Sequence, residues 1–437
     1  MRKYLLISII MLMIFYLQLQ AGKTVQLTLD NGMVVILKEN HSTAMVSSIV
    51  CVRAGSKFED QSNNGFTHFL EHLLFNGTKN RSRLELNEGF KEHGGYINAF
   101  TRKDLTGYLF VIPSKFVEYA LDAQADQLFN STLPEEEFPK ERKIVIEEIK
   151  MNNDDPEYRA EMFFDSLIYQ GTPYTQTVLG YKDIIASIPR EKVWAYYKER
   201  YVPNNMIALF IGDFQADAFA RLIDKYYGIY PPGKLPKQPT YKINPPYSKK
   251  IYIKEFPTDV TYVHIVFPAP RYEDPDYYSI DVLCQILDAG ETSPLYKVLT
   301  KGDDPLITSM SIYLETQHDF SLLHFSANTN DPRKVERIVT LVSRFFTDAS
   351  NLPIDKKQLK RIVVKNKTDQ IYLEEKLHYY GVIQAPKLVN CGYNFILRYV
   401  QNLSRVKPQD IQKAAGKYFS QRKYLAMAMV PPIQEEN

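Results

Sequence analysis

Two histidines with a glutamate between them are the residues of this sequence best suited to chemistry. His68 and His72 stand four residues apart in the segment HFLEH. If the segment is helical, both imidazoles project from one face, a turn apart, and can chelate one zinc ion. Glu71 is then close enough to exchange a proton with a metal-bound water. The alternative is an amphipathic helix with a structural histidine pair. The segment predicts a zinc site with Glu71 as its base.

A catalytic zinc site needs a third protein ligand and an open position for water. The predicted helix 139–152 offers that ligand, because two carboxylates share a stripe with apolar residues at helical spacing. The members of the stripe are Glu141, Ile144, Val145, Glu148 and Ile149. Glu147 falls on the opposite, charged face and is a poor ligand. Carboxylates on an apolar stripe are costly unless they meet a cation, which is either zinc or the partner in a buried salt bridge.

The elements around these two helices predict an α+β domain. Asn31-Gly32 between two alternating runs predicts a β-hairpin, and Asn76-Gly77 ends the helix that carries the histidines. The expected strands are 24–29, 33–38, 47–53, 108–113 and 206–212, and the expected helices are 66–75, 115–129, 139–152 and 216–227.

The same order of elements restarts after a proline-rich segment, in which six prolines lie between residues 231 and 246. A strand at 261–267, a helix near 278 and a strand at 424–430 follow. Counting from the acidic end of each preceding loop makes 282–286 (VLCQI) the counterpart of 68–72. We expect an internal duplication of two similar domains, each an antiparallel sheet with helices on one face. The predicted domains are 22–230 and 250–437, joined by the linker 231–249, and the second domain lacks the metal motif.

The first 21 residues are predicted to be a signal peptide. A basic start precedes residues 5–17, which are apolar except for Ser8. As a helix this run rises about 20 Å, too short for a bilayer core of about 30 Å. Cleavage is expected after Ala21, with an uncleaved N-terminal anchor as the alternative. We expect an exported protein, periplasmic or else secreted or anchored, with no membrane span after signal removal.

Composition excludes several other classes of protein. There are 53 basic and 51 acidic residues, and Arg2 and Lys3 supply the excess, so the body has no basic surplus for nucleic-acid binding. Three cysteines, none in a CxxC pair, exclude a disulfide framework and a zinc ribbon. Cys51, Cys284 and Cys391 are expected to be structural.

These motifs resemble those of the inverzincin metallopeptidases, the family of pitrilysin, insulin-degrading enzyme and mitochondrial processing peptidase. HFLEH is the family's H-x-x-E-H, and the 75 residues between His72 and Glu148 agree with the family's spacing to its third ligand. Residues 141–148 (ERKIVIEE) fit its E-R-x-V-x-x-x-E pattern with isoleucine in place of valine. Further matches are LDNG at 29–32, GFTH at 65–68, FNGT at 75–78, GGYINA at 94–99 and PNNM at 203–206. The resemblance spans essentially the whole chain after residue 21.

The resemblance implies one Zn²⁺ per chain, held by His68, His72 and Glu148. It implies that Glu71 is the catalytic base and that Glu141 is a supporting acid of the catalytic site. It also implies that a peptide or unfolded polypeptide substrate adds as a strand to a sheet edge at 94–101, with Asn98 and Ala99 at the contact. His93 is not expected to be a ligand. Five further histidines are expected to be isolated, with structural or exposed positions: His41, His264, His318, His324 and His378.

The second half departs from the family pattern. Active single-chain members carry an arginine and, seven residues later, a tyrosine that hold the substrate carbonyl. Here Thr300 or Lys301 and Ile307 or Thr308 stand at those positions. We therefore expect a zinc endopeptidase that acts with a homologous partner chain carrying the Arg/Tyr pair. The alternatives are a self-sufficient peptidase, as a homodimer for example, and a non-catalytic peptide-binding or chaperone-like subunit with a structural zinc.

Overall fold

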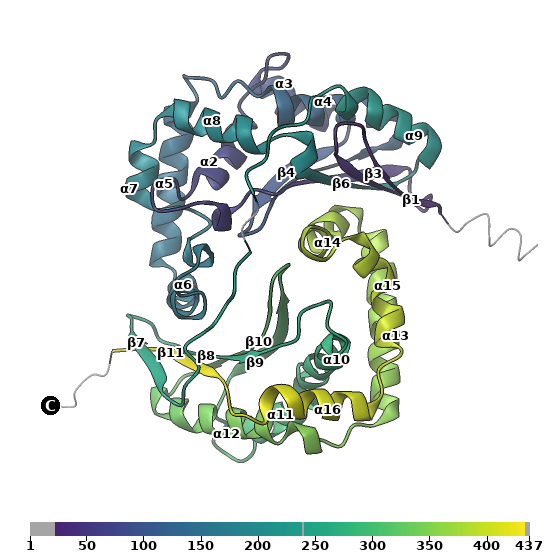
Figure 1. Cartoon of the computed structure of the whole chain (residues 1–437). Coiled ribbons are helices and arrows are strands. Elements are labelled where there is room, and N and C mark those ends of the chain that lie inside the picture. Colours follow the sequence, from purple (N-terminus) through teal and green to yellow (C-terminus); the bar gives the residue numbers. More distant parts are fainter. Residues whose placement is uncertain (1–21, 238–239, 433–437) are drawn as a thin grey trace, which may run out of the picture.

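Two β-sheets, one in each half of the chain, face each other across the middle of the molecule (Figure 1). The computed structural model describes residues 22–237 and 240–432. The predicted signal peptide, residues 1–21, lies outside the described residues. The two-domain α+β class expected from the sequence is confirmed.

The first sheet has six strands in the order β1-β2-β6-β3-β5-β4. Their bounds are β1 Thr24–Thr28, β2 Val34–Glu39, β3 Met45–Val52, β4 Tyr96–Thr101, β5 Thr106–Pro113 and β6 Met206–Gly212. The predicted hairpin is β1–β2, antiparallel with Thr24 opposite Lys38. Gly32, in the turn between them, has φ +84°, a conformation that glycine adopts at little cost.

The second sheet repeats the topology of the first without its outermost strand. Its order is β7-β11-β8-β10-β9, with β7 Ile251–Glu255, β8 Thr261–Pro268, β9 Ser309–Thr316, β10 Ser321–Thr329 and β11 Leu425–Val430. In both sheets the last strand of the half inserts beside an early strand and runs parallel to it, β6 to β2 and β11 to β7. Purely antiparallel sheets were expected, but both sheets are mixed. The parallel pairs arise because a long helical connection returns the chain to the middle of each sheet.

Helices cover both faces of each sheet, not one face as expected. The first half contains α2 Phe66–Leu73, α3 Arg83–Glu92, α4 Val117–Asn130, α5 Phe138–Asp154, α6 Pro156–Ile168, α7 Lys182–Ser187, α8 Arg190–Arg200 and α9 Ala216–Ile223. The second half contains α10 Tyr277–Leu287, α11 Pro294–Leu299, α12 Val335–Thr347, α13 Lys356–Glu375, α14 Leu377–Cys391, α15 Tyr393–Leu403 and α16 Pro408–Phe419.

The inner face of each sheet is covered by a helix from the other half. Helix α14 packs on β3, β5 and β6, and α6 packs on β8 and β11 (Figure 1). This exchange explains why β6 reads as a continuous apolar run, since every one of its residues is buried. It also joins the halves through two shared apolar clusters, one around Tyr380 of α14 and one around Phe164 of α6.

The segment between the sheets, 231–250, contains no helix or strand in its described residues. Within the described part of the chain, no helix combines the length and the apolar character that a membrane crossing requires.

Candidate zinc peptidase site

Helix α2 presents its histidines because a buried carboxylate fixes its N-terminus. Gly65, just before the helix, has φ +96° and leaves no room for a side chain against Gly180. Glu59 accepts hydrogen bonds of 2.7 Å from the backbone N–H groups of Gly65 and Thr67. It thereby satisfies donors that a helix start leaves open. The Thr67 hydroxyl also lies 2.9 Å from the hydroxyl of Tyr196 on α8.

Three side chains from α2 and α5 converge on one point. His68 Nε2 lies 3.6 Å and His72 Nε2 3.5 Å from the same oxygen of Glu148, Oε2. A hydrogen bond would be shorter, about 2.7–3.2 Å. Donors bound to one tetrahedral zinc at about 2.0–2.1 Å lie about 3.3 Å apart. The spacing thus fits the ligands of one zinc ion, and within the described ranges no other His, Cys, Asp or Glu trio comes together in this way.

Glu141 lies on the far side of His72 from Glu148. Its Oε2 is 3.4 Å from His72 Nδ1, and its Oε1 accepts a hydrogen bond of 3.1 Å from Arg83. Burial acts to raise the pKa of Glu141, but His72 and Arg83 outweigh burial and keep the pKa below its usual value. Glu141 is thus an anion that orients the imidazole from behind, as a carboxylate commonly does for a metal-bound histidine.

The pKa values of the two imidazoles are shifted in opposite directions. Burial and the neighbouring His72 lower the pKa of His68 to about 4. Burial also acts to lower the pKa of His72, but the neighbouring carboxylates of Glu141 and Glu148 outweigh it and raise the pKa to about 9. The neighbouring His72 is the largest influence on Glu148 and lowers its pKa. The site therefore attracts positive charge, which a divalent cation would supply.

Glu71 is held separately from the three converging side chains. Its Oε2 accepts a hydrogen bond of 2.6 Å from the hydroxyl of Thr101 at the end of β4. Burial raises the pKa of Glu71 above its usual value, although Thr101 and His72 act in the opposite direction. A raised pKa moves a carboxylate toward the range in which a general base works near neutral pH.

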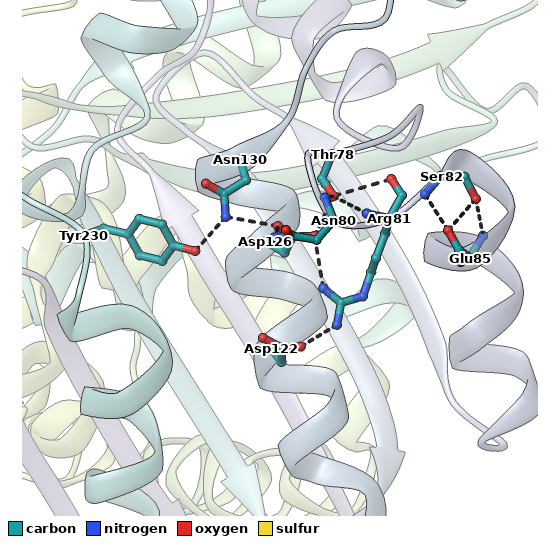
Figure 2. Close-up of polar contacts among 9 residues, drawn as sticks. All are labelled: Thr78, Asn80, Arg81, Ser82, Glu85, Asp122, Asp126, Asn130 and Tyr230. Carbon is teal, nitrogen blue, oxygen red and sulfur yellow. Dashed lines mark hydrogen bonds and ion pairs between the residues drawn. The ribbon is translucent and has the colours of Figure 1, made fainter.

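The loop after α2 is tied down by a network of polar contacts, and this loop leads to Arg83 (Figure 2). Asp126 of α4 accepts hydrogen bonds from Thr78, Asn80 and Arg81 on the loop. Ser82 and Glu85 then form a capping box at the start of α3. Because both ends of the segment are fixed, Arg83 is delivered to Glu141 in a defined position.

The prediction that Ile144 belongs to the buried stripe of α5 is wrong. Glu141, Val145 and Ile149 are buried, but Ile144 is 48% exposed. The buried stripe is continued by Phe138 instead. Ile144 lies at the edge of that stripe, on the side of the helix where Glu148 emerges.

Asn98 and Ala99 lie on β4, the edge strand of the first sheet, whose outer side pairs with no other strand in the described chain. Asn98 is exposed and Ala99 is buried. The Asn98 side chain accepts a hydrogen bond of 2.9 Å from the Ala99 N–H. Their place on a sheet edge, joined to Glu71 through Thr101, is suited to an extended ligand.

The stretch expected to lack the carbonyl-holding pair has no such group in the structure. The Thr300 hydroxyl donates to the Tyr296 carbonyl, and Lys301 is exposed. Ile307 is part of the second hydrophobic core, and the Thr308 hydroxyl donates to the Asn328 carbonyl.

Two histidines expected to be isolated are in contact. His264 Nε2 lies 2.9 Å from His324 Nδ1, and both rings are buried. His324 Nε2 lies 3.0 Å from Glu315, which accepts a hydrogen bond from Tyr169 of the first half. The expectation fails because adjacent strands β8 and β10 bring together residues that are far apart in sequence. The role remains structural, since the chain of contacts joins the two halves.

Sequence reasoning did not find Glu59, Arg83 or Thr101 as parts of the site. Glu59 has a weak signal, an acid placed before the helix that carries the motif. Arg83 and Thr101 have none, because their contacts depend on how α3 lies against α5 and how β4 packs against α2.

Comparisons with known proteins identify the family of this chain. The family model described as insulinase (peptidase family M16) matches residues 34–182, and that of the peptidase M16 inactive domain matches 187–365. An uncharacterized zinc protease, YmxG, of Bacillus subtilis is 28% identical over 302 residues, 69% of this chain and 73% of that protein. A probable mitochondrial-processing peptidase subunit beta of Schizosaccharomyces pombe is 29% identical over 71% of this chain and 67% of its own length.

A solved protease structure from Helicobacter pylori shares the fold, with a TM-score of 0.83 and 23% identity, over 94% of this chain and 100% of that one. The two family models match consecutive segments, 34–182 and 187–365, which contain strands of both sheets, and the two relatives are named as a zinc protease and a processing peptidase subunit. The chain belongs to peptidase family M16, the insulinase family of zinc metallopeptidases.

Proposed function

We propose that the chain is a zinc-dependent endopeptidase that hydrolyses extended or unfolded peptides. The observation that carries this proposal is the convergence of His68, His72 and Glu148 at ligand spacing, with Glu71 held beside them. One zinc ion per chain would be held by these three side chains. A structural zinc site is usually closed by four protein ligands, and the trio here supplies three.

Bound zinc would supply Lewis acidity and lower the pKa of a coordinated water toward 7. Glu71 accepts the proton of the attacking water at a carboxylate oxygen and later donates it to the nitrogen of the leaving amine. Thr101 holds Glu71 in place through its hydroxyl. Glu141 holds the His72 ring through Nδ1, so that Nε2 faces the metal position.

The substrate would pair with the free edge of β4, where Asn98 and Ala99 are the expected contacts. Main-chain hydrogen bonds along a sheet edge read an extended backbone more than a particular side chain. This mode explains a preference for unfolded polypeptide, since a folded protein offers few segments that can add as a strand.

A homologous partner chain would supply the arginine and tyrosine that are missing at 300–308. The apolar segment 5–17 favours action in an exported compartment, most simply the periplasm. A non-catalytic peptide-binding subunit is the second candidate, and it is favoured by the same missing pair. Glu71 argues against it, because a structural zinc has no use for a base.

The test is a peptidase assay on the purified chain with unstructured peptides, alone and with a homologous chain that carries the Arg/Tyr pair. We expect slow hydrolysis by the chain alone, an increase of about 10²-fold or more with the partner, and loss of both activities on chelation. A turnover near 10 s⁻¹ by the chain alone, typical of enzymes, would exclude the need for a partner. No hydrolysis under any condition, with zinc bound, would support the non-catalytic subunit.

A further inference from the structure

A cavity of about 720 Å³ opens in the second half of the chain, where helices α10, α13, α14 and α15 meet strand β9 (Figure 1). Pockets that hold small molecules commonly measure about 300–1,000 Å³ and are lined mostly by apolar side chains. Every residue that lines this cavity lies between 277 and 399, so a ligand here would touch none of the side chains of the proposed zinc site. The cavity is therefore a separate candidate site.

One face of α13 forms a wall of the cavity. Its lining residues follow helical spacing and are Gln358, Arg361, Ile362, Lys365 and Asn366. Helix α13 contacts α10 as α5 contacts α2 in the first half. The cavity thus occupies the place in the second half that the candidate metal site occupies in the first, although the metal motif is absent there.

The buried part of the cavity lining is mostly apolar. Ile286, Ile312, Ile362 and Phe395 line the cavity and are themselves buried. Ile383 of α14 also lines it and is 50% exposed. A hydrocarbon body in the cavity would remove its own apolar surface, and that of Ile383, from water.

Two cations of the lining, Arg361 and Lys387, are exposed and form no ion pair within the described part of the chain. Lys365, the third cation, pairs with Asp369 at 2.6 Å. Lys387 Nζ lies 4.9 Å from the centre of the ring of Tyr399, which also lines the cavity. Because Arg361 is on α13 and Lys387 on α14, one carboxylate at the solvent side of the cavity could accept hydrogen bonds from both helices.

The acids of the lining limit a ligand to one negative charge. Asp281 is buried and accepts a hydrogen bond of 2.6 Å from Tyr399, and Asp288 accepts one of 2.8 Å from the Ile312 N–H. These carboxyl groups already have donors, and they would repel a second negative charge on a ligand. A basic run at 356–367, with six lysine and arginine residues and no acid, adds attraction for anions at longer range.

We propose that this cavity binds an amphipathic carboxylate of the fatty-acid class, with its hydrocarbon body against the apolar lining and its carboxylate between Arg361 and Lys387. The ligand is a free molecule rather than a lipid within a bilayer, because the apolar side chains line a cavity instead of a protruding surface. The inference goes beyond the proposed peptidase function and does not depend on it, since it involves neither zinc nor hydrolysis.

The first experiment is calorimetric titration of the purified chain with dodecanoate below its micelle concentration. We expect about one dodecanoate to bind per chain. Octanoate, which has a shorter chain, should bind at least about tenfold more weakly because it buries less apolar surface. Dodecylammonium should also bind at least about tenfold more weakly, because its charge has the same sign as those of Arg361 and Lys387. Acetate, which lacks the hydrocarbon body, should show no measurable binding.

The second experiment uses variants to place the ligand in the cavity. Arg361→Gln combined with Lys387→Gln should weaken dodecanoate binding by about tenfold or more. Lys360→Gln, exposed on α13 but outside the lining, should change the affinity by less than about twofold. Ile383→Ser should weaken binding by about threefold or more, whereas Leu397→Ser, exposed on α15 outside the cavity, should not. All these positions are exposed, so the variants should fold, which circular dichroism checks.

No binding of dodecanoate, or equal binding of dodecanoate and dodecylammonium, would overturn the proposal. Unchanged affinity in the Arg361 and Lys387 double variant would overturn it as well. Cosedimentation of the chain with phosphatidylglycerol vesicles, without binding of dodecanoate, would also refute the cavity as the site and assign the basic run of α13 to a membrane surface. Binding of dodecanoate by a chain that hydrolyses no peptide would support this proposal while the peptidase proposal fails.

Discussion

Helices α2 and α10 occupy equivalent places in the two halves but differ in whether their polar side chains are hydrogen-bonded to neighbouring side chains. Each follows a central strand, packs against the edge strand of its sheet, and contacts the third helix that follows it, α5 or α13. Each also contacts a tyrosine hydroxyl from a later helix, Thr67 with Tyr196 and Asp281 with Tyr399. The scaffold is the same, so the difference lies in the side chains.

In the second half the polar groups satisfy one another. Tyr399 donates to Asp281 at 2.6 Å, and Asn366 of α13 donates to Gln285 at 2.6 Å. In the first half, His68 and His72 lie 3.6 Å and 3.5 Å from Glu148, beyond the range of about 2.7–3.2 Å for such bonds. A partly buried polar cluster that does not close on itself is stabilised by another charge. The candidate metal site therefore differs from its counterpart in the unsatisfied spacing of its side chains and not in the fold around it.

The largest expected effect comes from the base and its counterpart. Glu71→Gln should lower kcat by about 10²–10⁴-fold, because it removes the group that takes the proton from water. The matched change in the other half, Gln285→Glu, should alter kcat by less than about twofold. Peptide hydrolysis and bound zinc are measured on both variants. If Glu71→Gln keeps full activity, α2 is no more catalytic than α10, and the zinc is structural.

Zinc affinity should separate the ligands from the supporting acid. His68→Ala and Glu148→Gln should abolish stoichiometric zinc, because each removes one of three ligands. Glu141→Gln should weaken zinc by about 10–100-fold, as loss of a group behind a metal-bound histidine does.

Metal analysis and competition with a chelator measure these affinities. Glu147→Gln, on the solvent face of the same helix, is the control and should bind zinc like the unaltered chain. Full zinc in both His68→Ala and Glu148→Gln would contradict the ligand assignment.

Sequence alone predicted the zinc motif and the duplication because both depend on local spacing. The i, i+4 histidines and the repeated order of strand, loop and helix are visible without any tertiary contact. The contacts of Arg83, Thr101 and Glu59 are not, since each joins elements that only the fold brings together. The packing of α6 and α14 on the sheet of the other half could not be predicted for the same reason. The expectation that helices cover only one face of each sheet was wrong as a result. The sequence of a helix does not show that it packs on the sheet of the other half.

An acidic residue precedes each of the two helices, Glu59 before α2 and Glu273 before α10. Glu59→Gln should lower the free energy of unfolding by about 1–3 kcal/mol, because a buried N–H of Gly65 or Thr67 loses its acceptor. Glu273 ends the corresponding loop of the second half but is exposed and contacts Arg271. Glu273→Gln should therefore change stability by less than about 0.5 kcal/mol. Urea denaturation measures both, and equal effects would show that Glu59 is not a cap.

The smallest expected effect is a pH dependence found on α10 and absent at the equivalent Thr67 of α2. Burial raises the pKa of Asp281, although hydrogen bonds from Tyr399 and Gln285 act against it. A carboxyl whose pKa is higher in the folded than in the unfolded state, where it is about 3.9, binds more protons when folded. Its contribution to stability therefore falls as pH rises from about 4 through the folded pKa, and stays low above it.

Asp281→Asn keeps the shape and an acceptor for Tyr399 but cannot ionise. We expect this variant to melt a few degrees higher than the unaltered chain at pH 7–8, and the difference to shrink as the pH approaches 4, as measured by thermal unfolding across pH. A variant that melts lower than the unaltered chain at every pH would show that the carboxylate is needed for the Tyr399 contact, and α10 would then resemble α2 in depending on its charge.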